Sequence, residues 1–241
     1  MARAYGFGWH RLRSTDPVTA AEFYVALFGW SATESMAGFT FRDEQGRGVA
    51  GLDLADPGGP PRWTPYLSVS DLDAALAEFG TLAGAHVGPP TDSEIPPGRF
   101  AEVQHPAIGQ VALFEGSSAV LSPAGFGWHQ LDTPESKAAS SLLSSFAGWN
   151  PKPTALEGAT VLGELGTLFN GVTVTSAPMA AISSWLCYVR VPRLREVIRR
   201  ATELGALVVT EQTLIPPVGP ASVVRDFDGL AIACYEAAAP R

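Results

Sequence analysis

The chain has 241 residues, 46% of them hydrophobic, which is enough to bury one large core or two of ordinary domain size. Its formal net charge is -8, and this argues against a nucleic acid partner, because binding to phosphates depends on clustered lysine and arginine. The nearest approach to a basic cluster is the run of arginines between residues 190 and 200. We expect this run to form a solvated helix face.

No segment of the sequence indicates a membrane partner or export. The N-terminus lacks an apolar signal core, and no apolar stretch reaches the roughly 18 residues that a spanning helix needs. We therefore expect a cytoplasmic protein. Cys187 and Cys234 lie in apolar, strand-like contexts without metal-finger spacing, so buried reduced thiols are expected.

The first predicted unit runs from the N-terminus to about Leu54. A short strand at 7–13 is followed by Asp16 and Pro17, which are typical of a helix cap and of a first helical position. Apolar residues then recur at helical spacing until Gly29, which ends the helix, and short strands follow.

The same order restarts at Trp63. A strand at 66–69 precedes Asp71, which caps a second predicted helix, and three strands then lead to Glu115. The sequence thus predicts a βαβββ unit that is used twice in the first half.

The second half repeats the first. Residues 6–10, GFGWH, recur letter for letter as residues 125–129, and further matches follow in the same order. Units are expected to begin near Phe126 and Ser184, with helices at 136–146 and 194–204. The proline-containing connector at 117–124 places the domain boundary, so we predict domains at 1–118 and 123–241.

Two βαβββ units can pair into a curved eight-stranded sheet that encloses a cavity. We therefore predict an α+β fold with two tandem domains of this kind. The units, together with Trp9-His10 and the segments 21–24, 27–30 and 69–75, resemble the vicinal-oxygen-chelate superfamily of glyoxalases, bleomycin-resistance proteins and extradiol dioxygenases. The resemblance is greatest to the two-domain members labelled glyoxalase-like proteins or hydroxylases.

The resemblance also implies positions for a metal. In metal-dependent relatives the ligands are a His on the first strand of one unit, a His or Glu on the first strand of the next, and a Glu on the last strand. The equivalent residues here are His10, Pro65 and Glu115 in the first half, and His129, Cys187 and Glu236 in the second. Pro65 has no ligand atom, so the first site lacks its middle ligand unless Asp53 on the preceding strand supplies one. A lone Cys among apolar residues, such as Cys187, is more typical of packing. No catalytic metal is expected. If one divalent metal (Fe, Mn, Ni or Zn) binds, its ligands would be His129, Cys187 and Glu236.

The residues left at these positions suggest acid–base chemistry without a metal. His10 with Glu115, and His129 with Glu236, are the candidate catalytic pairs, since a carboxylate can orient an imidazole and stabilise its charge. The alternative is that they are inherited polar residues that satisfy one another in a partly wet pocket. Strand alternation and the apolar surroundings suggest a cavity wall suited to aromatic ligands, with contacts from Trp63, Leu113, Trp185, Cys187 and Tyr188.

The resulting hypothesis is a protein of secondary metabolism that binds a small, largely apolar or aromatic, natural-product-like molecule. We expect it to transform this ligand without a metal, by isomerase, cyclase or lyase chemistry. Two alternatives stay open: sequestration without catalysis, as in the bleomycin-resistance branch, and a metal-dependent dioxygenase or lyase in the second domain. A small organic ligand is the expected partner, and monomer and homodimer are both open.

Overall fold

The computed structural model describes residues 4–35, 38–116, 125–154, 158–163 and 171–236. Four helices appear among them in chain order: α1 (Pro17–Phe28), α2 (Leu72–Gly80), α3 (Ser136–Ala147) and α4 (Leu194–Glu203). The strands of the first half are β1 (Ala4–Ser14), β2 (Ser31–Ser35), β3 (Gly38–Arg42), β4 (Gly48–Leu54), β5 (Arg62–Val69), β6 (His86–Val87), β7 (Thr91–Glu94), β8 (Pro97–His105) and β9 (Gly109–Gly116). Those of the second half are β10 (Phe126–Thr133), β11 (Lys152–Pro153), β12 (Ala159–Leu162), β13 (Val172–Ser176), β14 (Ser184–Val191), β15 (Leu207–Ile215), β16 (Gly219–Arg225) and β17 (Ala231–Glu236).

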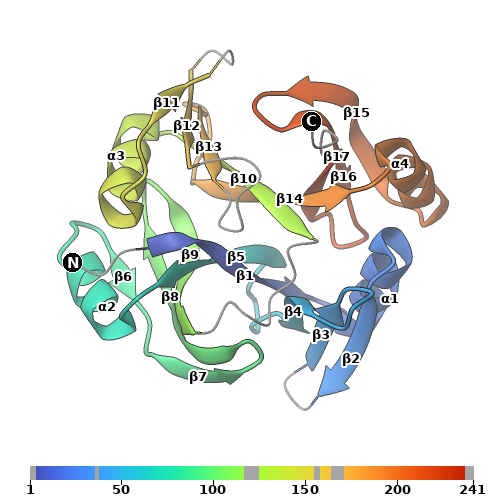
Figure 1. Ribbon diagram of the computed structural model, residues 1–241, viewed down its shortest axis with the longest axis horizontal. Helices are drawn as coiled ribbons and strands as arrows, with labels where there is room; N and C mark the ends of the chain where they lie inside the picture. The colour runs from blue at the N-terminus through green and yellow to red at the C-terminus, as the bar shows by residue number, and fades with distance from the viewer. Residues whose placement is uncertain (1–3, 36–37, 117–124, 155–157, 164–170, 237–241) are drawn as a thin grey trace. The chain divides into compact units, whose positions relative to one another are not determined.

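The elements form four βαβββ modules, beginning at β1, β5, β10 and β14, so the predicted repeat and the α+β class are confirmed (Figure 1). The second module departs from the pattern, because the strand after its helix is divided into β6 and β7, which both pair with β8. Pro89 and Pro90 lie between the two pieces. Proline has no backbone N–H to donate to a sheet, which explains the break.

The helix ends follow from local sequence. The Asp16 side chain accepts the backbone N–H of Thr19 at 3.1 Å, and Pro17 occupies the first helical position of α1. Gly29 ends the helix in the left-handed conformation, at φ 73°, where its N–H donates to Val25. Asp71 caps α2 in the same way, through the N–H of Ala74 at 2.9 Å. Both predicted caps are confirmed.

The modules group into two compact units. Unit 1 consists of Met1–Trp9, Thr64–Val120 and His129–Trp185, and unit 2 consists of His10–Trp63, Leu121–Trp128 and Leu186–Arg241. Unit 1 therefore joins the second and third modules, and unit 2 the first and fourth. Among the described residues, the chain passes from one unit to the other inside β1, β5, β10 and β14, the first strand of each module. The predicted domain boundary at 118–123 lies outside the described residues, and the division at that point stays a prediction.

In unit 1, β5 runs parallel to β9 and β10 runs parallel to β13, with the remaining strands antiparallel beside them. Helices α2 and α3 meet through the rings of Phe79 and Phe146, which lie edge to face at 6.1 Å. The core draws on both modules, and its largest contributions include Phe7, Leu67, Leu72, Phe79, Leu131, Leu143 and Phe146.

Unit 2 is built in the same way, with β1 parallel to β4 and β14 parallel to β17. Helices α1 and α4 lie side by side (Figure 1), and the Arg200 guanidinium donates to the backbone oxygen of Leu27 at 3.1 Å. Its core includes Leu12, Phe23, Tyr24, Leu27, Phe41, Trp63, Phe126, Cys187, Val189 and Leu194.

Hairpin turns tie the two modules of each unit together. In the turn between β16 and β17, the Asp228 carboxylate accepts a hydrogen bond from the Ser14 hydroxyl at 2.5 Å, and the Asp226 carboxylate accepts one from the Tyr24 hydroxyl at 2.8 Å. The β8–β9 turn in unit 1 is bonded similarly, since Ser183 donates to the backbone oxygen of Pro106 at 2.6 Å. Among the described helices, none is long and apolar enough to cross a membrane.

Candidate functional site

His10 and His129, the predicted catalytic histidines, each lie beneath a phenylalanine from the other half of the chain. In unit 2 the rings of His10 and Phe126 stack with centroids 3.7 Å apart and 14° between their planes. In unit 1 the rings of His129 and Phe7 are 3.8 Å apart. Because Phe7 and Phe126 are equivalent positions of the repeat, the two arrangements are copies of one local solution.

Tryptophans complete each aromatic cluster. Trp63 and Trp30 lie 5.1 and 6.1 Å from the ring of Phe126. Trp185 and Trp149 lie 5.5 and 5.9 Å from that of Phe7. Both histidines are buried, so the chain's own aromatic rings pack where the sequence suggested ligand contacts.

Burial determines the protonation of His129. Its side chain is 0% exposed, and desolvation lowers its pKa to about 3, although the backbone oxygen of Gly171, 3.4 Å from Nδ1, acts in the opposite direction. The imidazole is therefore neutral near pH 7. A general base works best when its pKa is near the working pH, so the described surroundings of His129 disfavour that role.

The two predicted catalytic glutamates each accept a hydrogen bond from a backbone N–H at the N-terminus of a helix. An Oε2 atom of Glu115 accepts the backbone N–H of Leu72 at 3.0 Å, at the start of α2. Glu236 accepts the N–H of Leu194 at 2.9 Å, at the start of α4. The first N–H groups of a helix lack partners inside it and favour a negative charge, so each carboxylate stabilises its helix. A catalytic role for Glu115 or Glu236 stays a prediction.

Two of the metal ligands that the resemblance suggested, Cys187 and Glu236, lie at different levels of the sheet. In the parallel pair β14–β17, Glu236 lies opposite Val191, which is four residues beyond Cys187. At a rise of about 3.3 Å per residue this separates the two backbone positions by about 13 Å. The register therefore disfavours joint ligation by Cys187 and Glu236, and a metal at His129, Cys187 and Glu236 stays a prediction. The fold of unit 2 instead brings Cys187 within 4.8 Å of a ring nitrogen of His10. Burial raises the pKa of the Cys187 thiol well above its usual value.

The predicted ligand contacts lie mostly inside the cores. Trp63, Leu113, Cys187 and Tyr188 are at most 5% exposed, and the indole of Trp63 donates to the hydroxyl of Tyr24 at 3.2 Å. Trp185 is half-buried and donates to the backbone oxygen of Ile108 at 2.7 Å. These contacts account for the five residues as packing and positioning groups, and their contact with a ligand stays a prediction.

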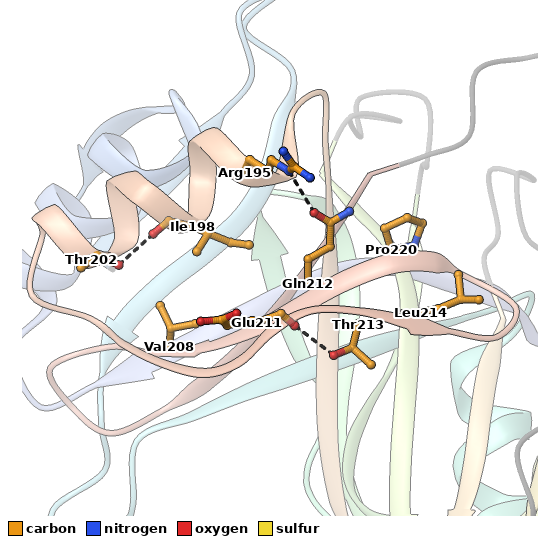
Figure 2. A pocket seen from close by; sticks show the side chains of 9 residues that line it. All are labelled: Arg195, Ile198, Thr202, Val208, Glu211, Gln212, Thr213, Leu214 and Pro220. Atoms are coloured by element: carbon orange, nitrogen blue, oxygen red, sulfur yellow. Dashed lines mark hydrogen bonds between the residues drawn. The ribbon is translucent and has the colours of Figure 1, made fainter.

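Unit 2 contains an opening between α4 and the β15–β16 hairpin (Figure 2), which we call the α4 groove. Its volume is about 780 Å³. Its lining residues are Arg195, Ile198, Thr202, Val208, Glu211, Gln212, Thr213, Leu214 and Pro220.

The α4 groove results from the way α4 and β15 are built. Helix α4 buries the stripe Leu194, Val197 and Ala201, so the next stripe, formed by 195, 198 and 202, borders the groove. Strand β15 changes register against β16 between Val208 and Thr210 and again between Thr210 and Thr213. Such irregularities bend a strand and increase its twist, and β15 exposes residues on both of its faces.

The chemistry of the α4 groove is mixed. Ile198, Val208, Leu214 and Pro220 provide apolar surface, while Arg195 and Gln212 form a polar bridge, with Nε and Oε1 3.4 Å apart (Figure 2). The volume falls within the roughly 300–1,000 Å³ of small-molecule sites, which usually combine apolar walls with a few polar groups.

The α4 groove was not predicted from the sequence. One signal was present: Ile198 lies outside the buried stripe of its helix, with Arg195 and Thr202 on the same side. The irregular register of β15 against β16 depends on the partner strand, so no local sequence pattern predicts it.

Comparisons with known proteins support the fold. No family model matches the chain. Among solved structures, it is similar to the Mn(II)-bound glyoxalase from Novosphingobium aromaticivorans, with a TM-score of 0.73 at 14% identity over 98% of this chain and 83% of that one. It is also similar to BphC, a halotolerant catechol dioxygenase, with a TM-score of 0.71 at 11% identity over 97% and 87% of the two chains. The chain thus has the vicinal-oxygen-chelate fold, as predicted.

Two relatives in sequence are named as anthracycline biosynthesis proteins. The chain is 29% identical to the anthracycline biosynthesis protein DnrV of Streptomyces peucetius, over 86% of this chain and 85% of that protein. It is 27% identical to the anthracycline biosynthesis protein DauV of Streptomyces sp. (strain C5), over the same shares.

Proposed function

We propose that this protein binds a small, largely apolar, aromatic molecule that carries oxygen substituents, of the polycyclic kind to which anthracyclines belong, and that the α4 groove holds it. The observation that carries the proposal is the α4 groove itself, a site of about 780 Å³ with apolar walls and a polar bridge. The names of DnrV and DauV supply the class of molecule.

The lining of the α4 groove suits such a ligand. Fused rings present broad apolar faces, which Ile198, Val208 and Leu214 would shield from water. Ring hydroxyls and carbonyls need hydrogen-bond partners at the edge, and Arg195 and Gln212 offer both donors and an acceptor. A hydrogen bond as long as that between Arg195 and Gln212 would be exchanged for contacts to the ligand at little expense.

Binding without proton transfer by the His–Glu pairs is the role that the side chains support best. His129 is neutral and enclosed by Phe7, and Glu236 is engaged by the first turn of α4. Sequestration, or presentation of the molecule to another enzyme, requires no titrating group at these positions.

A fluorescence titration with an anthracycline tests the proposal. Leu214 is 73% exposed, so Leu214→Glu leaves the core intact while it places a charge in the α4 groove. We expect affinity to fall about tenfold or more, which corresponds to about 1.4 kcal/mol. The matched control is Leu207→Glu on the same strand, 65% exposed and outside the groove lining, which should bind as the wild type does.

Chromatography of the same mixtures separates binding from catalysis. We expect the ligand to be recovered unchanged. Equal affinity in the two leucine variants would refute the site. A product that forms with the wild type and disappears with His129→Gln would refute the proposed role and favour acid–base chemistry.

A further inference from the structure

A second, smaller cavity in unit 2 lies beside a different part of α4 and is lined by three arginines. Its volume is about 100 Å³. The charged side chains that line it are Arg190, Arg193, Arg200 and Glu196, and the end of α1 forms part of its wall.

The three guanidinium groups come from different places and are held separately. Arg190, on β14, donates from Nε to the hydroxyl of Tyr235 at 3.2 Å. Arg200, on α4, donates to the backbone oxygen of Leu27 at 3.1 Å. Arg193 pairs with Glu196 at 2.6 Å. One carboxylate thus accompanies three positive charges among the lining residues.

This arrangement corrects one expectation from the sequence. The arginines at 190–200 were expected to form a solvated helix face, which describes Arg199, an exposed residue paired with Glu203. Arg190 and Arg200, however, are half-buried and converge on the cavity together with Arg193. Strand β14 and helix α4 bring these arginines to one cavity, and their spacing along the chain does not indicate this arrangement.

We infer that this cavity binds a small oxyanion, a carboxylate or a phosphate group. Like charges around a partly enclosed space repel one another more strongly than in bulk water, and an anion between them removes that repulsion. Guanidinium groups match the geometry of carboxylate and phosphate oxygens.

The size of the cavity limits the ligand. A volume of about 100 Å³ holds one carboxylate or phosphate group and excludes a fused ring system, so the site differs from the α4 groove in both charge and size. Because its wall includes Leu27, Phe28 and Trp30 as well as residues of α4, a bound oxyanion would join the first and fourth modules of unit 2.

Thermal unfolding at constant ionic strength tests this inference. Inorganic phosphate and acetate are each titrated against chloride on the intact protein. We expect the oxyanion to raise Tm by about 3–5 °C at a tenfold excess over its Kd. The shift should disappear in Arg190→Gln and shrink in Arg193→Gln. A response to acetate alone indicates the carboxylate of an organic molecule, and a response to phosphate indicates a phosphate group.

The matched control is Arg199→Gln, which removes the same charge from helix α4, away from the cavity. It should respond as the wild type does. If Arg190→Gln does not fold, Arg193→Gln decides the matter, because the Arg193 side chain is 73% exposed. The absence of any shift, or one that Arg193→Gln leaves unchanged, would overturn the inference.

Discussion

The buried imidazole of His129 predicts a specific loss of stability in mild acid. Its pKa is lowered from 6.5 to about 3 in the folded protein, because burial disfavours the charged form. Between these two values the unfolded chain binds more protons than the folded one. Stability is therefore complete above the unfolded pKa and falls as the pH falls towards 3.

The magnitude follows from the two pKa values. Between pH 7 and pH 5 the unfolded state gains about 2 kcal/mol from protonation of this one residue, while the folded state gains almost nothing. The neutral variant His129→Gln should lack this contribution. The fall in unfolding free energy from pH 7 to pH 5 should consequently be about 2 kcal/mol larger in the wild type than in the variant.

Urea unfolding at the two pH values measures this difference directly. His86→Gln is the control, since His86 is exposed on the short strand β6 and should keep the wild-type dependence on pH. Only the difference between pH values counts, so a general loss of packing in His129→Gln does not affect the conclusion. If the wild type and His129→Gln lose the same free energy, His129 is not a buried neutral imidazole.

Two further predictions concern buried residues of unit 2. Tyr24→Phe removes a hydroxyl that donates a hydrogen bond to Asp226 and accepts one from the indole N–H of Trp63. Because the indole N–H is left without that partner, the unfolding free energy measured in urea should fall by about 1–3 kcal/mol. A change below a few tenths of a kcal/mol would contradict this contact. Gly127→Ala places a Cβ against the Tyr235 hydroxyl and should lower stability by about 1–3 kcal/mol, and Tyr235→Phe in the same chain should recover part of it. If the second substitution restores nothing, the overlap is not the cause.

The sequence by itself determined the modules and their ends. Helix α1 begins and ends as predicted because Asp16 bonds to Thr19 and Gly29 bonds to Val25, all within a few residues. Apolar spacing and the repeated GFGWH segment likewise act locally. Such signals can be recognised without knowledge of the rest of the chain, so the four βαβββ modules and the vicinal-oxygen-chelate fold could be predicted.

Only the tertiary structure decided what surrounds each candidate residue. The sequence shows that Phe126 and Phe7 occupy equivalent positions, but it does not show that Phe126 stacks on His10, which lies over a hundred residues away. Nor does it show that Glu236 holds the first turn of α4, or that β15 shifts its register beside that helix. These outcomes depend on which module packs against which, and that choice is made by the burial of whole faces, summed over many weak contacts between distant segments.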